Sequence, residues 1–331
     1  MKNHWHLNRA DCKKLLYQLI VWVYYGGEFF DEKTNRQPRL NTMTQQLPLV
    51  ISRPNEDPAL LRRRFNDDGY LYFKRAVSRQ RCDHLMHQML QCLAPHIAFD
   101  HEKKLPQLIG KPFFETDAIW DEVYPKIQSL PYFHDFFHQD DVQQLMQLLV
   151  GEKVFVYPMK LGRVACPKKL GYETPAHQDA RSHQAGPTMA GMWVALHDTK
   201  QGMGRLQILP ASHKDGVRPV TQADGVGGVQ CEILDHETIW HVSDVEQGDV
   251  IIFHSCCVHR AEPNTTDNTV RLSVDTRFCD YGAPVFVSNL DPHHGWRIDS
   301  LNWDSIYQDW PDTRLQYYWR DYPEVFSDFR Y

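Results

Sequence analysis

The sequence lacks the features that mark secreted, nucleic-acid-binding and membrane proteins. Its eight cysteines include no CxxC pair and no disulfide-framework spacing, so they are expected to be reduced thiols, several of them buried. A net charge of −6 leaves no basic excess for nucleic acid. The apolar run at residues 15–25 has about eleven residues, too few to span a bilayer, and the polar start is no secretory signal. We therefore expect a cytoplasmic protein that binds neither nucleic acid nor a membrane.

The length and composition are those of an ordinary globular protein. The 331 residues, 42% hydrophobic and 24% charged, suffice for one large β domain with additions. Short basic clusters at 62–64 and 168–169 are expected to be solvated surface and not a cradle for phosphate or coenzyme A. Residues 1–57 are predicted to form a helical N-terminal extension, residues 58–281 the core domain, and residues 282–331 an aromatic-rich C-terminal extension that packs on the core.

The two halves of the core differ in their hydrophobic periodicity. In the first half, helices are predicted at 60–67, after Ser78 and at 141–149, with a strand at 70–73. In the second half no helix-length pattern appears. Short β-rich runs alternate there with loops rich in Gly, Pro, Asn and Asp, at 154–159, 189–196, 204–209, 250–253 and 270–278. This succession predicts a mainly β fold with flanking helices, either an antiparallel sandwich or a jelly-roll barrel.

A histidine and an aspartate lie two positions apart, at His177 and Asp179. On an extended chain these side chains point to the same face, so both can reach one ion while Gln178 points away. With a distant second histidine they would supply the 2-His-1-carboxylate ligands of a non-heme Fe(II) site, which leaves positions open for oxygen and an organic co-substrate. Such triplets also occur by chance in polar loops. The position of this one, between a predicted strand and a loop, favours the metal site.

Two histidines, His254 and His259, compete for the third ligand position. They follow the apolar strand at 250–253 and fall on opposite faces in its alternation, so only one can face the metal. His259 is favoured because Arg271 lies twelve residues beyond it, at the start of the next strand, where a hairpin brings both to the same mouth of the barrel.

Other groups near the motif have competing interpretations. Cys256 or Cys257 could provide a thiolate ligand, which suits zinc or an iron–sulfur cluster better than an oxygen-activating iron. His183 follows Asp179 closely and could lie near the metal. The remaining histidines are expected to be surface or structural residues.

Arg271 is the candidate anchor for a carboxylate co-substrate. Alone, it would be interpreted as part of a surface or structural ion pair. Its neighbours Val270, Leu272 and Val274 make the strand look buried, where an unpaired guanidinium is costly. A co-substrate carboxylate is a fitting bidentate partner, and Ser273 on the same face can give that carboxylate a second hydrogen bond.

Taken together and in order, these segments resemble the phytanoyl-CoA dioxygenase family of Fe(II)- and 2-oxoglutarate-dependent oxygenases. The resemblance spans about residues 60–281 and rests on the segments 68–70, 177–179, 192–196, 204–213, 248–259 and 271–278. It implies a double-stranded β-helix, a jelly-roll or cupin-like barrel, in which His177, Asp179 and His259 hold iron. It also implies that 2-oxoglutarate and O2 are co-substrates. Arg271 would then pair with the far carboxylate of 2-oxoglutarate, in a pocket lined by Met159, Lys160 and Trp193.

The activity implied by the resemblance is hydroxylation of an unactivated C–H bond of a small-molecule metabolite, with release of succinate and CO2. The chain departs from the family pattern in two places: Arg260-Ala261 stands where Gly-Ser is frequent, and Ala211 replaces a turn glycine. The missing serine removes one expected hydrogen bond to the co-substrate. An aspartate at 179, in place of a small residue that would free a site for chloride, favours hydroxylation over halogenation.

Two rival functions would keep the same barrel. A cupin-like isomerase or lyase would use the three ligands without 2-oxoglutarate, and Arg271 would then be dispensable. A catalytically silent metal-binding barrel would keep the ligands without turnover. Residues 98–135 and the aromatic tail are expected to shape the substrate pocket. The substrate, the choice between hydroxylation and desaturation or ring formation, and the oligomeric state are left open.

Overall fold

The computed structural model describes residues 44–168 and 170–331, and residues 44–328 form one compact unit. The predicted helix at 15–25 lies outside the described residues. In the part of the chain that is described, no helix is long and apolar enough to cross a membrane.

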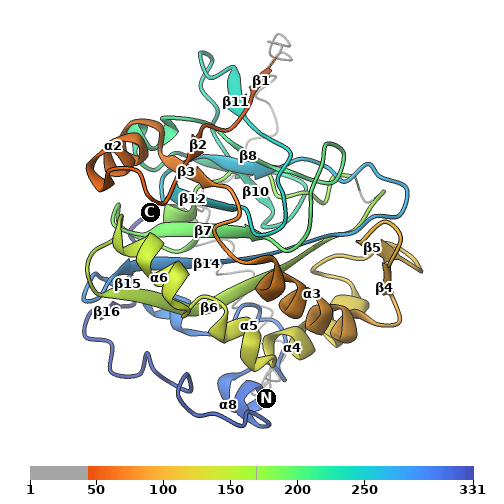
Figure 1. Cartoon of the computed structure of the whole chain (residues 1–331). Coiled ribbons are helices and arrows are strands. Elements are labelled where there is room, and N and C mark those ends of the chain that lie inside the picture. The colour runs from red at the N-terminus through yellow and green to blue at the C-terminus, as the bar shows by residue number, and fades with distance from the viewer. Residues whose placement is uncertain (1–43, 169) are drawn as a thin grey trace, which may run out of the picture. The chain divides into compact units, whose positions relative to one another are not determined.

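Two β-sheets form the centre of this unit (Figure 1). The major sheet has six strands in the order β2 (Ile51–Ser52), β3 (Tyr70–Phe73), β12 (Val250–His254), β7 (Ala190–Ala195), β14 (Arg271–Asp280) and β6 (Val154–Ala165). The minor sheet has four strands in the order β1 (Gln45–Leu47), β11 (Ile239–His241), β8 (Leu206–Ile208) and β13 (His259–Ala261). Neighbouring strands are antiparallel except for the two pairs made by the N-terminal strands β1 and β2.

Three short strand pairs lie outside these sheets, β4 (Ile97–Asp100) with β5 (Leu105–Leu108), β9 (Val220–Gln222) with β10 (Val229–Cys231), and β15 (Val285–Phe286) with β16 (Val325–Phe326). The described α-helices are α2 (Pro58–Asp68), α3 (Arg79–Leu93), α4 (Ala118–Gln128), α5 (Pro131–Asp135), α6 (Asp140–Gln147), α7 (Asp179–Ser182) and α8 (Trp303–Tyr307). Two 3-10 turns cover Ser212–Asp215 and Val287–Leu290.

The major sheet buries both of its faces, and strand alternation divides them. On β12, Val250 and Ile252 belong to an outer core shared with α3, α4, α5 and α6. The alternate residues Ile251 and Phe253 belong to an inner core with Leu206 and other residues of the minor sheet. The inner layer is therefore the space between the two sheets, as the jelly-roll interpretation requires.

On β14 the same alternation separates apolar from polar side chains. Leu272 and Val274 enter the outer core. The intervening positions carry buried polar and charged groups, Arg271, Ser273, Asp275 and Arg277. This strand alone thus delivers four polar side chains to the space between the sheets, where burial of charge must be compensated.

The first helices begin and end where the sequence predicts. Asp57 Oδ1 accepts from the backbone N–H of Ala59 at 2.9 Å, and α2 ends at Gly69, whose φ of 79° is left-handed. Ser78 caps α3 by accepting from the N–H of Arg81. The aromatic tail contributes Trp303 and other rings to the outer core.

Candidate metal and co-substrate site

Three predicted ligands meet between the sheets. His177 and His259 are joined by two backbone hydrogen bonds of 3.0 and 3.1 Å, and Asp179 begins α7 immediately afterwards. Nε2 of each histidine lies 3.9 Å from Oδ1 of Asp179. Those separations are too long for hydrogen bonds, and they leave room for one ion between ligands with bonds of about 2.0–2.2 Å. The three donor atoms lie within 4.8 Å of one another.

Backbone carbonyls fix the protonation of both histidine rings. Nδ1 of His177 lies 2.8 Å from the carbonyl oxygen of Pro175, and Nδ1 of His259 lies 3.0 Å from that of Cys257. A carbonyl can only accept, so Nδ1 carries the proton and Nε2 presents its lone pair toward the aspartate. Desolvation and the neighbouring His259 lower the pKa of His177 to about 3, so its ring is neutral, the form that binds metals.

Arg277 holds the carboxylate of Asp179 in place. Its Nε donates to Oδ2 at 2.8 Å and its Nη2 to Oδ1 at 2.9 Å. Burial alone would raise the pKa of Asp179, but the charge of Arg277 keeps it well below its usual range. The absence of a side chain at Gly191 leaves space for Asp179 and for the ring of Phe253. A Cβ at this position would lie 3.0 Å from Oδ2 of Asp179 and 2.4 Å from Cε2 of Phe253.

The charges continue away from the ligands in a chain of ion pairs. Arg277 also donates to Asp275, and Arg163 binds that carboxylate through Nε at 2.8 Å and Nη2 at 3.3 Å. Beyond Arg163 lies Glu115, whose Oε1 is 3.7 Å from Nη1. Each carboxylate in this series of ion pairs therefore has a guanidinium beside it.

Arg271 differs from these arginines because it has no directly paired carboxylate among the described residues. It is buried, and among the described residues no carboxylate pairs with it and Nε has no hydrogen-bond partner. Desolvation and the nearby Arg163 lower its pKa to about 10, so it stays cationic at neutral pH. Its Nη1 donates to Ser273 Oγ at 3.3 Å, and Trp193 Nε1 donates to the same oxygen at 2.9 Å.

A small, partly open pocket connects Arg271 with the histidine pair. It is lined by His177, His259, Trp193 and Arg271, among others. The pocket therefore offers two binding groups to a dicarboxylate. One end could chelate a metal ion held by the histidines, and the other carboxylate could pair with the guanidinium of Arg271.

Comparisons with known proteins agree with this geometry. The model of the phytanoyl-CoA dioxygenase (PhyH) family matches residues 65–272, more than half of the chain. The chain belongs to this family. The 1-deoxypentalenic acid 11-beta-hydroxylase of Streptomyces exfoliatus is 27% identical to this phytanoyl-CoA dioxygenase family member over 235 residues, 67% of this chain and 81% of the relative.

Solved structures share the fold of this family member. The apo form of the non-heme monooxygenase ThoJ has a TM-score of 0.53 at 20% identity, covering 68% of this chain and 79% of that one. The epimerase SnoN in complex with Fe3+, alpha ketoglutarate and nogalamycin RO has a TM-score of 0.50 at 17% identity, covering 69% of this chain and 87% of that one. The predicted fold, a double-stranded β-helix, and the predicted class, a 2-oxoglutarate-dependent dioxygenase, are confirmed.

The rival residues have other hydrogen-bond partners in this dioxygenase, although His183 lies near enough to Asp179 for their charges to interact. Nδ1 of His254 accepts from the N–H of Cys256, and its ring centroid lies 5.0 Å from that of His213, with the two rings tilted by 47°. His183 is engaged with Asn289 at 2.7 Å. Desolvation raises the pKa of the Cys257 thiol to about 12, and Cys257 Sγ donates to a backbone carbonyl. None of these residues belongs to either of the two groups of potential metal ligands found among the described residues.

Two residues that the resemblance places in the co-substrate pocket do not line it. Lys160 points to the outer face of β6, where Nζ contacts the carbonyl of Tyr157 at 3.0 Å and the hydroxyl of Tyr318 at 3.4 Å. Met159 belongs to the inner face of the strand, but is not among the residues that line the pocket. Ala261 does line the pocket. The serine hydroxyl that is frequent at this position in the family would therefore have faced the co-substrate.

The structure adds members that sequence reasoning missed: Arg163, Asp275, Arg277, Gly191 and Glu115. For two of them a signal was present. Asp275 and Arg277 continue the alternation of Arg271 and Ser273 along β14, so extending the strand's pattern would have placed them on the same face.

Proposed function

We propose that His177, Asp179 and His259 hold Fe(II), that Arg271 binds 2-oxoglutarate, and that the enzyme hydroxylates an unactivated C–H bond of a small molecule. The observation that carries the proposal is the buried, unpaired Arg271 beside two histidines whose Nε2 lone pairs face a common carboxylate. Cytoplasmic location and a small-molecule partner are predictions that accompany it.

The bound group and the protein have separate tasks. Fe(II) with 2-oxoglutarate and O2 supplies the oxidising chemistry that turns C–H into C–OH and releases succinate and CO2. The chain orients the ligands through the carbonyls of Pro175 and Cys257, and Arg277 keeps Asp179 ionised and aligned. Arg271 and the Ser273 hydroxyl fix the far carboxylate, while the inner core excludes water from one side.

Arg271 distinguishes this function from the isomerase or lyase alternative. Only the charge of Asp275, which is not in direct contact with it, offsets the desolvation of Arg271, so a bound carboxylate would supply the partner that the guanidinium lacks. A metal-dependent isomerase that lacks 2-oxoglutarate would gain nothing from such a residue.

The test is an anaerobic titration of purified protein with Fe(II) and then 2-oxoglutarate, followed by the weak visible charge-transfer band of an iron–keto-acid chelate. We expect a band in the wild type, a weak band with unchanged iron content in Arg271→Met, and loss of iron in His259→Ala. Arg314→Met, which removes an exposed arginine, is the matched control. Iron binding without any band in the wild type would refute the assignment of 2-oxoglutarate and favour the isomerase or lyase.

A further inference from the structure

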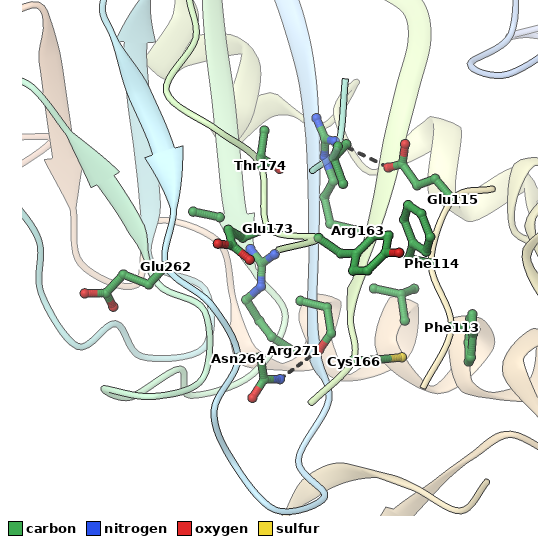
Figure 2. A pocket seen from close by; sticks show the side chains of 15 residues that line it. Phe113, Phe114, Glu115, Arg163, Cys166, Glu173, Thr174, Glu262, Asn264 and Arg271 are labelled. Atoms are coloured by element: carbon green, nitrogen blue, oxygen red, sulfur yellow. Dashed lines mark hydrogen bonds and ion pairs between the residues drawn. The ribbon is translucent and has the colours of Figure 1, made fainter. Parts of the chain in front are cut away.

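A second pocket adjoins the first and shares Arg163 and Arg271 with it. Figure 2 shows its charged wall: Arg163 faces Glu115 across an ion pair, and the ring of Phe114 lies beside Glu115, with Phe113 farther away. The rings of Phe114 and Tyr172 contact each other with centroids 3.9 Å apart. An opening with aromatic walls and one ion pair beside a reactive centre has the make-up of a substrate subsite.

The ion pair at this wall is incomplete. Arg163 directs Nε and Nη2 to Asp275, whereas Nη1 stands 3.7 Å from Oε1 of Glu115, beyond hydrogen-bond distance. Both atoms therefore retain hydrogen-bonding capacity, one as a donor and one as an acceptor. Their separation resembles that between the ammonium nitrogen and a carboxylate oxygen of an α-amino acid.

Glu115 is held in its charged form. Its other oxygen, Oε2, lies 3.3 Å from Nε2 of His294, a residue only 5% exposed. Burial would raise the pKa of Glu115, but contact with His294 and the charge of Arg163 lower it below its ordinary value. The carboxylate is thus an available anion at neutral pH.

The donor atoms of Glu115, His293 and His294 also lie within 4.8 Å of one another, which raises the alternative of a second metal site. One ring nitrogen of His293 is already engaged, because Nδ1 lies 2.6 Å from the hydroxyl of Tyr124, which also accepts from Gln128 Nε2 at 2.9 Å. Glu115 in turn contacts Nε2 of His294 through Oε2 at 3.3 Å. We therefore interpret Glu115 as a hydrogen-bonding anion and not as a metal ligand.

The charges around the two pockets balance. The three positive charges of Arg163, Arg271 and Arg277 equal in number the three negative charges of Glu115, Asp179 and Asp275. Two further lining residues, Arg260 and Glu173, add one charge of each sign. The further pocket residue Glu262 is paired with Arg205 at 2.8 Å. Fe(II) and the two carboxylates of 2-oxoglutarate also cancel, so the best-matched third ligand carries no net charge. A zwitterion meets this condition, and a polyanion such as a coenzyme A ester does not.

We propose that the substrate is a free α-amino acid, whose ammonium group binds Glu115 and whose carboxylate binds Nη1 of Arg163. The ammonium and carboxylate of the substrate would lie opposite the carboxylate of Glu115 and the guanidinium of Arg163, and the side chain of the substrate would pack against the aromatic residues of the pocket. This inference rests on the proposed function, since it assigns the substrate of that same site.

The experiment uses the full-length protein loaded anaerobically with Fe(II) and 2-oxoglutarate. The standard L-α-amino acids are added singly, and each that shifts the charge-transfer band is compared with its N-acetyl and methyl ester derivatives. Oxygen is then admitted and succinate is measured against the amino-acid-free sample. Glu115→Gln removes the anion with little change of shape, and Glu122→Gln on the exposed face of α4 is the matched control.

We expect at least one free amino acid to shift the band and to raise succinate formation, and its two derivatives to bind at least about tenfold more weakly, the equivalent of one lost charge-assisted contact. Glu115→Gln should raise the amino acid's Kd by a similar factor while the band without amino acid is unchanged. A wild-type band that no amino acid shifts, or equal binding of a derivative, overturns the substrate assignment and leaves the proposed function standing. Absence of the band overturns both.

Discussion

Replacing Lys160 by methionine should stabilise the protein, and the gain should depend on pH. Lys160 is fully buried, and no carboxylate among the described residues pairs with it. Desolvation lowers its pKa from 10.5 to about 7. At about 1.4 kcal/mol per pKa unit, keeping the ammonium charged inside the protein costs on the order of 5 kcal/mol. The lost contacts with Tyr157 and Tyr318 return about 1 kcal/mol each, so Lys160→Met should gain about 2–4 kcal/mol near pH 6.

The sign of the pH dependence follows from the two protonation states. The unfolded chain keeps the proton on Lys160 up to its pKa of 10.5, whereas the folded protein releases it near 7. Between those values the unfolded state binds more protons, so wild-type stability attributable to this residue rises with pH, and the full cost is present below about pH 7. The advantage of Lys160→Met should therefore shrink as the pH rises toward about 10.

Urea unfolding over this pH range, with tryptophan fluorescence as the signal, measures the difference directly. Lys126→Met, which removes an exposed lysine of α4, is the control and should show little change at any pH. If Lys160→Met were less stable than the wild type near pH 6, or its advantage did not vary with pH, the buried ammonium would not carry the cost assigned to it.

Three further substitutions test separate parts of the site and fold. Gly191→Ala would bring a methyl group within 2.4 Å of Phe253 and 3.0 Å of Asp179, so Fe(II) affinity should fall at least about tenfold in an anaerobic titration; unchanged affinity would show that the ring and the carboxylate are not confined. Ala211 adopts a left-handed φ of 62°, so Ala211→Gly should add about 0.5–1 kcal/mol to the free energy of unfolding in urea, and a loss of stability would contradict the strain. Arg277→Met leaves Asp179 buried without a counter-ion, which should cost about 3 kcal/mol in the metal-free protein and less when Ni(II) is bound; an equal loss in both states would refute its role as counter-ion.

The sequence predicted those parts of the molecule that depend on short stretches of chain. The caps at Asp57 and Ser78 are local hydrogen bonds, so α2 and α3 were found close to their true bounds. Helices α4 and α5 were not predicted, because Pro125 lies inside one and Pro131 opens the other, and prolines usually mark helix ends. The run Trp120, Val123, Tyr124 and Ile127 nevertheless has helical spacing.

The site residues also divide into those that local sequence spacing predicts and those that only tertiary packing brings together. The spacing of His177 and Asp179, and the hairpin that leads to Arg271, are properties of neighbouring residues, and the structure brings these side chains together. Glu115 and Arg163 come from segments whose proximity depends on the packing of α4 against the sheet, which no periodicity reveals. Lys160 illustrates the converse: a motif-based assignment places it in the pocket, but the pairing Thr276↔Lys160 puts it on the outer face of β6.

If the proposed function holds, the guanidinium of Arg277 has a consequence for how the enzyme would acquire Fe(II). Many metal sites are unfolded or splayed before loading, because their ligands repel one another or lack partners. Here the aspartate has a counter-ion and both imidazoles are hydrogen-bonded to backbone carbonyls, so protein groups alone hold the three ligands in position. Folding should therefore not depend on iron, and a chelator should remove the ion without unfolding the barrel. A protein of this kind would be reloaded with Fe(II) and would not need to be made again.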